Sequence, residues 1–104
     1  MTYPPVTIAI LIYRSPAWLS FVLEGLAWSR NRTPYRTLIV GNDAEPQVME
    51  TGRVDLDFRN HDPSEYYLNR VYNAWNAAVE AAETDWVVLM NSDQYPSDYW
   101  LDEL

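Results

Sequence analysis

The stretch from Trp86 to Asp98 constrains the fold of this chain more than any other. Its first five residues, 86–90, are all apolar and form a run too short for a typical helix. The run lacks the alternation of a half-exposed strand, so it predicts a strand buried on both faces of a parallel sheet. Asn91 and Asp93 follow at once. Polar residues there lie at the carboxyl end of a parallel strand, where open α/β sheets bind ligands.

The composition limits the domain count and the kinds of partner. With 104 residues, the chain 1–104 is long enough for one small domain with a single core. A formal net charge of −8 argues against nucleic-acid binding, which needs clustered basic residues. There is no cysteine, which fits a reducing compartment, and we therefore expect a cytoplasmic protein. The apolar run from Val6 to Tyr13 follows two prolines without a basic flank, so we expect neither a signal peptide nor a transmembrane segment.

The first half of the chain predicts three strands and one helix. The apolar run near the N-terminus predicts a central buried strand, and Ser15 with Pro16 predicts the N-cap and first residue of a helix. Residues 36–40 predict the next strand, which closes in the turn residues 41–43. Alternating apolar residues over 53–59 predict an edge strand with one solvated face.

The second half predicts a long helix before the strand described first. Asp62 as N-cap, Pro63 at the first position and Glu65 in a capping box predict its start. An apolar stripe is predicted to lie against the sheet, formed by Leu68, Val71, Tyr72, Trp75, Val79 and Ala82. Ser97 after Pro96 predicts a further helix start. This order of elements predicts a Rossmann-like three-layer α/β/α sandwich with a mostly parallel sheet of about four strands.

Four short motifs stand in a fixed order along these elements. They are Ile12-Tyr13-Arg14-Ser15 after the first strand, Val40-Gly41-Asn42-Asp43-Ala44 after the second, Asn76-Ala77-Ala78 on the long helix, and Asn91-Ser92-Asp93 after the last strand. Together they resemble the N-terminal, nucleotide-sugar-binding half of family-2 glycosyltransferases of the GT-A fold. That family has Asn-x-Gly on the helix and a strand ending in Asp-x-Asp, with the spacing that separates Asn76 from Asp93. The chain differs where Ala78 replaces the glycine, Asn91 replaces the first acid, and Asp43 carries a displaced acid.

The resemblance implies a donor site and a metal. Asp93 would hold Mn²⁺ or Mg²⁺ together with the diphosphate of a nucleotide sugar, most simply a UDP-sugar. Asn91 would bond the ribose or a metal-bound water, Tyr13 would stack on the base, and Asn42 or Asp43 would bond the base or ribose. The family's catalytic base belongs to an acceptor half with no counterpart in this sequence. The chain is therefore expected to be a truncated transferase or a donor-binding module.

Structural roles stand beside these functional ones. For Tyr13, stacking on a ligand and packing in the core are equally compatible with the sequence. Asn42 and Asp43 fit a simple turn, and Asn76 fits helix–sheet packing better than ligand contact. A non-catalytic α/β interaction or assembly module is the alternative to a glycosyltransferase-like enzyme. Exposed apolar side chains are expected after the last strand, with a homo-oligomer as the consequence. These side chains are Tyr95, Tyr99, Trp100 and Leu101.

Overall fold

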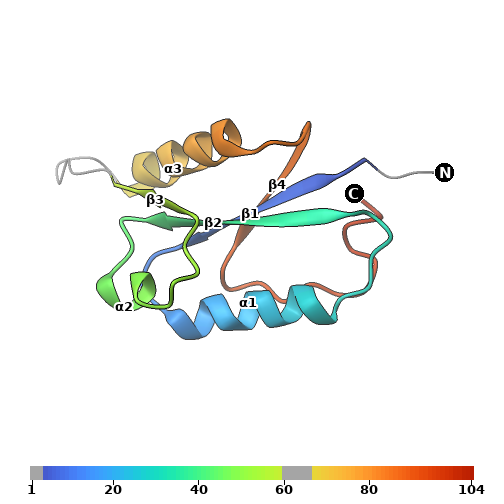
Figure 1. Cartoon of the computed structure of the whole chain (residues 1–104), viewed down its shortest axis with the longest axis horizontal. Coiled ribbons are helices and arrows are strands. Elements are labelled where there is room, and N and C mark those ends of the chain that lie inside the picture. The colour runs from blue at the N-terminus through green and yellow to red at the C-terminus, as the bar shows by residue number, and fades with distance from the viewer. Residues whose placement is uncertain (1–3, 60–66) are drawn as a thin grey trace.

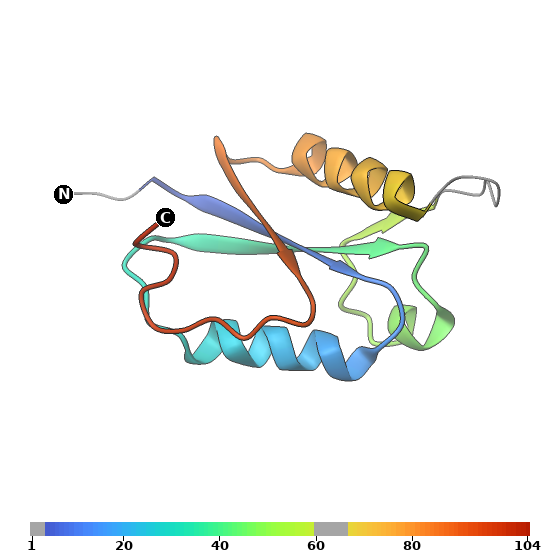
Figure 2. The same ribbon diagram turned by 180° about the vertical axis from the view of Figure 1, so that it is seen from behind.

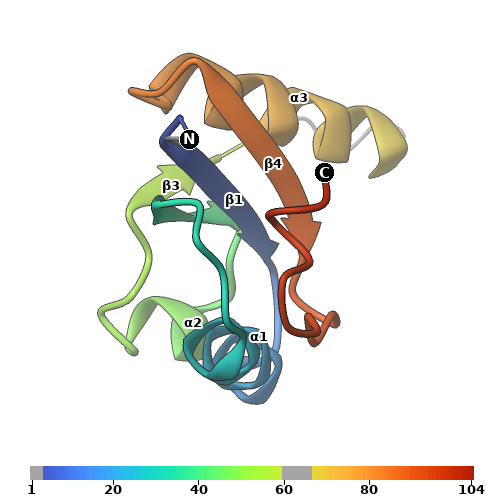
Figure 3. The ribbon, with the colours of Figure 1, turned by 90° about the vertical axis from the view of Figure 1, so that its right-hand side faces the viewer.

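The structure, a computed structural model, describes residues 4–59 and 67–104 and consists of one sheet with helices on both faces (Figure 1). The elements are β1 (Val6–Ile12), α1 (Pro16–Trp28), β2 (Tyr35–Asn42), α2 (Pro46–Met49), β3 (Leu56–Phe58), α3 (Tyr67–Ala81) and β4 (Trp86–Asn91). The four strands are parallel and lie in the order β3-β2-β1-β4. Viewed end-on, α1 and α3 cover opposite faces of the sheet (Figure 3). The predicted α/β class with a parallel sheet of four strands is confirmed.

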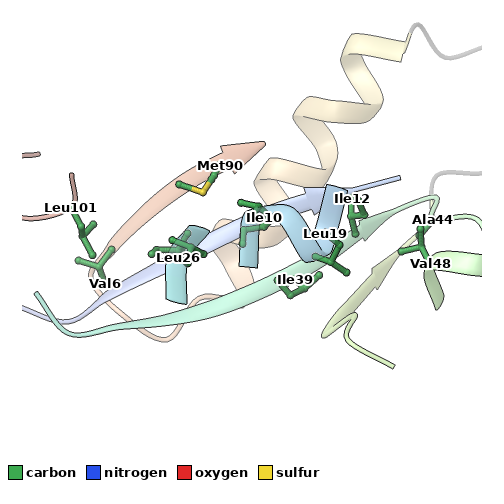
Figure 4. Close-up of a cluster of buried hydrophobic side chains, with 12 residues drawn as sticks. Val6, Ile10, Ile12, Leu19, Leu26, Ile39, Ala44, Val48, Met90 and Leu101 are labelled. Carbon is green, nitrogen blue, oxygen red and sulfur yellow. The ribbon is translucent and has the colours of Figure 1, made fainter. Parts of the chain in front are cut away.

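The core is built around β1, as its nearly continuous apolar run predicts. All seven residues of the strand are buried because β2 and β4 flank it and a helix layer covers each face. Ile8 and Ile10 face α1, where they pack with Leu19 and Val22 (Figure 4 shows this cluster). The smaller cluster on the α3 side contains Ala9. The rigid centre of the molecule therefore holds the carboxyl end of β1 in place.

The local signals for α1 are confirmed. Ser15 is the N-cap, and its Oγ atom accepts a hydrogen bond from the Trp18 N–H at 3.3 Å. Pro16 occupies the first helical position, where its missing N–H costs nothing. The neighbouring strand β2 is longer than predicted, and β3 is reduced to three residues at the far edge of the sheet.

Residues 86–90 form a strand as predicted, but the prediction that both faces of this strand are buried is wrong. β4 is an edge strand, with β1 as its only strand partner among the described residues. Trp86 is 63% exposed and Leu89 is 45% exposed. Leu89 lies on the α3 face of the sheet and stays uncovered because α3 packs mainly against β1, β2 and β3. Trp86 lies on the opposite face, which it shares with Val88 and Met90.

The buried face of α3 agrees with the predicted stripe only in part, since Val71 and Trp75 pack against the core as predicted. Ala74 and Ala78 are fully buried against the sheet, whereas Tyr72 and Val79 are exposed. Small side chains let the helix approach the strands closely, and the larger apolar residues then lie to the side. The predicted helix start at 62–65 lies outside the described residues.

The helix predicted from Ser97 does not form. Residues 98–103 make successive turns, and Tyr99 adopts a positive φ of 61°, which a helix excludes. This C-terminal segment runs back alongside α1 (Figure 2). Tyr95 and Tyr99 are exposed as expected. The prediction is wrong for Leu101, which is buried in the core, and for Trp100, which is partly buried against it.

Two aspartates fix this segment to the loop between α1 and β2. The Asp98 carboxylate accepts a hydrogen bond from the Arg30 N–H at 2.8 Å. Asp102 accepts three, from the Arg32 N–H and from the N–H and hydroxyl of Thr33, at 2.7–2.9 Å. Partial burial alone would raise the pKa of Asp102, but these hydrogen bonds and the charge of Arg32 outweigh it and lower the pKa below its ordinary value.

Candidate functional site

The candidate site lies where β1 and β2 end side by side. Ile12 pairs with Gly41, so Tyr13 and Asn42 follow the last paired residues of two adjacent strands. The first part of α3, with Arg70 and Val71, faces the same edge and closes the site from the side. This is the carboxyl edge of a parallel sheet, where α/β proteins bind ligands.

A cavity of about 350 Å³ opens at this edge. Its lining contains one aromatic ring, two guanidinium groups, an amide, a carboxylate and an aliphatic side chain. These belong to Tyr13, Arg14, Asn42, Asp43, Arg70 and Val71. The volume falls in the range of small-molecule sites, and the polar groups converge from three different elements.

Backbone hydrogen bonds hold the loops around the cavity. The Tyr13 carbonyl accepts from the Glu45 N–H at 2.9 Å, and the Asp43 N–H donates to the Phe58 carbonyl at 2.9 Å. The Gln47 side-chain amide donates to the Arg14 carbonyl at 3.3 Å. The ends of β1, β2 and β3 are therefore joined to one another, which fixes the positions of the lining side chains.

Asp43 sits in an unusual backbone conformation, with φ at 49°. Aspartate and asparagine enter this left-handed region more readily than other residues with a side chain. The turn reverses the chain within the residues that line the cavity. As a result, Asn42 and Asp43, which are adjacent in sequence, both contribute to its wall.

The charge on the cavity wall is mixed. The Arg14 guanidinium lies 5.1 Å from the centre of the Tyr13 ring and 3.4 Å from the Glu45 carboxylate, while its side chain stays largely exposed. The buried Oδ1 atom of Asn42 has no hydrogen-bond partner among the described residues. A buried acceptor without a partner is costly, and a ligand donor would satisfy it.

The last strand brings its polar residues to the same edge of the sheet, outside the cavity lining. Asn91 pairs with Leu11 at the end of β4, and its N–H donates to the Gln94 side chain at 3.0 Å. Asn91 and Asp93 are both exposed. An exposed carboxylate with an amide oxygen two residues away suits Mg²⁺ or Mn²⁺ when substrate phosphates and water supply the other ligands. Within 4–59 and 67–104, no three acidic or histidine side chains gather into a metal cluster.

Asn76 does not reach the cavity lining. It is exposed on α3. Of the six residues predicted from the sequence, the structure brings Tyr13, Asn42 and Asp43 together and leaves Asn76 apart. Asn91 and Asp93 lie at the carboxyl end of β4, the strand next to β1.

Arg14 and Arg70 are the site residues that sequence reasoning missed. Arg14 directly follows Tyr13 at a strand end, a position that could have revealed it. Arg70 belongs to a helix far along the chain, and only the fold brings it to this edge. They supply two of the seven basic residues of a chain with a net charge of −8, and they line the cavity together with the carboxylate of Asp43.

A second cavity, of about 360 Å³, lies at the opposite, amino edge of the sheet. Its wall is mostly apolar and includes Pro4, Val6, Trp86, Val88, Leu101 and Leu104. Its polar residues, Thr33 and Asp102, already bond each other. The carboxyl-edge cavity is therefore the better candidate for recognising a polar ligand.

No family model, no curated protein and no solved structure matches this chain. Among the described helices, none is long and apolar enough to cross a membrane.

Proposed function

We propose that this chain is a glycosyltransferase-like domain that binds a nucleotide-diphospho-sugar donor. The observation that carries the proposal is the cavity at the carboxyl edge, because its lining combines an aromatic ring, hydrogen-bonding amide and carboxylate groups and two arginines. These are the groups that a base, a ribose and a diphosphate require. An otherwise acidic protein needs such local positive charge to hold an anion.

Each lining residue has a role in this proposal. The Tyr13 ring stacks on the base, and the unpartnered Oδ1 of Asn42 accepts a hydrogen bond from a base N–H. Asp43 accepts from the base or a ribose hydroxyl. Arg14 and Arg70 face the phosphates, where guanidinium groups form charge-assisted hydrogen bonds.

Asp93 is the proposed metal ligand, with Asn91 beside it. Mn²⁺ or Mg²⁺, when bound, would neutralise charge on the departing nucleoside diphosphate. Asn91 ends β4, the strand next to β1, and Asp93 follows it, so the two residues share the sheet edge on which the cavity opens. We also propose a cytoplasmic location, which the absence of cysteine favours and cell fractionation would test.

Calorimetric titration with UDP tests the donor site. We expect saturable binding that requires Mn²⁺ or Mg²⁺ and disappears on chelation. Tyr13→Ala should weaken it about tenfold by removing the stacking face, and Asp93→Ala should abolish binding as chelation does. Trp28→Ala, an exposed change at the far end of α1, is the matched control.

Two results would overturn the proposal. Wild-type protein that fails to bind UDP with metal present would remove the donor site. Metal-independent binding, unchanged in Asp93→Ala, would remove Asp93 from it.

An assembly module is the second candidate. It is favoured by the exposed apolar residues of the edge strand β4, because exposed apolar residues on a strand edge are typical of a protein–protein interface. Absence of UDP binding together with self-association in sedimentation experiments would support this alternative.

A further inference from the structure

An exposed aromatic surface lies on α1, next to the carboxyl edge of the sheet. It consists of Trp18 and Phe21 on the first turns of the helix and Tyr95 on the segment after β4, and we call these three residues the aromatic platform. The Trp18 and Phe21 rings meet edge to face at 5.4 Å, and Phe21 and Tyr95 lie 4.9 Å apart. Trp18 is 48% exposed and Tyr95 is 50% exposed. The platform thus joins two segments that lie 74 residues apart and leaves two aromatic rings half open to solvent.

Tyr95 packs against α1 at Gly25, where the helix has no side chain. A Cβ atom at this position would lie 3.0 Å and 3.1 Å from Tyr95 ring atoms and 2.9 Å from the Pro96 Cδ atom. The Tyr95 ring therefore packs directly on the backbone of α1. The position of the Tyr95 ring therefore depends on the absence of a side chain at Gly25.

The surroundings of the platform are polar. Glu24 follows Phe21 by one helical turn, Gln94 precedes Tyr95, and both side chains are exposed. The rings are inclined to one another, by 81° between Trp18 and Phe21 and by 44° between Phe21 and Tyr95, so they do not form one flat surface. Exposed aromatic rings beside hydrogen-bonding groups match a pyranose, whose C–H face is apolar and whose rim carries hydroxyls. A lasting protein partner would instead need a broad interface, of the order of 1,200 Å² or more. The net charge of −8 also disfavours an anionic membrane surface.

The platform lies close in sequence to both parts of the candidate donor site. Trp18 comes five residues after Tyr13, and Tyr95 comes two residues after Asp93. α1 begins at the carboxyl end of β1, so its first turns lie near the edge where the cavity opens (Figure 1). A sugar stacked on the platform would sit on the α1 side of that edge, while Arg70 and Val71 close the cavity from α3.

We propose that the aromatic platform binds a neutral sugar ring of an oligosaccharide, the chemical class of the acceptor. The inference rests on the proposed function for its place in the reaction, but the binding itself does not. Trp18 supplies the principal stacking face, and Tyr95, fixed by Gly25, supplies the second. Glu24 and Gln94 accept and donate hydrogen bonds at the rim.

Titration with three neutral hexasaccharides, cellohexaose, maltohexaose and chitohexaose, tests the platform. Tryptophan fluorescence and calorimetry should both show saturable binding of at least one of them. Trp18→Ala and Tyr95→Ala should each weaken it about tenfold, and Trp18→Phe should restore most of the affinity. Gly25→Ala should weaken binding without removing any aromatic residue, because it displaces Tyr95. Trp28→Ala, which removes a tryptophan that is 74% exposed on the same helix, should leave binding unchanged.

Melting curves of every variant identify changes that merely unfold the protein, and Tyr95→Ala replaces Trp18→Ala if the latter does not fold. The proposal is overturned if no hexasaccharide binds wild type, or if Trp28→Ala weakens binding as much as Trp18→Ala. UDP titrations of the same variants separate the two proposals. Hexasaccharide binding without UDP binding would remove the donor site and retain the platform, and the reverse result would do the opposite.

Discussion

Asp43 meets two demands at one position of the chain. Its backbone adopts φ 49° to turn the chain after β2, and its side chain lines the candidate cavity. A glycine there would keep the turn and lose the side chain. A β-branched residue would lose both, because its Cβ substituents clash in the left-handed region.

Asp43→Gly and Asp43→Val separate these roles. Both variants lose the carboxylate, so the difference between them reports on the backbone alone. We expect Asp43→Val to be less stable than Asp43→Gly by about 1–2 kcal/mol, measured by denaturant unfolding. UDP affinity should fall in both. Equal stabilities would mean that the positive φ does not constrain this position.

At the scale of elements, the hydrogen bonds of Asp102 between the C-terminal segment and the α1–β2 loop predict how the stability of the protein depends on pH. The pKa of Asp102 is lowered in the folded protein, so its carboxylate stabilises the fold above the unfolded-state pKa of about 3.9. That contribution is lost as the pH falls through the folded-state pKa.

Asp102→Asn should therefore destabilise the protein at neutral pH, with a difference from wild type that shrinks below about pH 4. Unfolding curves at several pH values measure this difference. Asp98→Asn is the control, and its effect should be smaller because Asp98 accepts one backbone hydrogen bond where Asp102 holds three donors. A difference between Asp102→Asn and wild type that stays constant from pH 7 to pH 2 would contradict the assignment.

The elements also show which features a sequence can predict. Ser15 and Pro16 correctly mark the start of α1 because capping depends on residues within one turn. The run in β4 correctly predicts a strand, but whether a strand is central or at an edge depends on the order of all strands, which no local run contains. Ala74 and Ala78 face the sheet because close approach rewards small side chains, a preference that a count of large apolar residues misses.

The candidate site also contains residues that could be predicted from the sequence and residues that could not. Tyr13, Asn42 and Asp43 were predictable because the carboxyl ends of parallel strands meet at one edge. Arg70 was not, because its approach depends on where α3 begins relative to β1 and β2. For the whole molecule, the uncovered side of β4 is the clearest departure from what the sequence predicts.

The free edge of β4 predicts concentration-dependent self-association. The strand contains no charged residue or proline to block pairing, and Trp86 and Leu89 are exposed. Leu89→Lys should lower the association constant measured by sedimentation equilibrium, because it places a charge on the edge. Trp28→Lys adds the same charge on α1 and should have a smaller effect. A wild-type protein that sediments as a monomer at every concentration would contradict this prediction.

The pairing of β1 with β4 has a consequence for how the molecule folds. Val6 lies opposite Trp86, so the sheet joins segments separated by 80 positions of the chain. Closing such a long loop costs entropy before the contacts form, and parallel pairings of this kind raise the contact order and slow folding. During synthesis, β1, α1 and β2 emerge together and are able to associate early. One side of β1 then stays unsatisfied until β4 leaves the ribosome, so the most apolar strand of the protein is also the one exposed longest to misassembly.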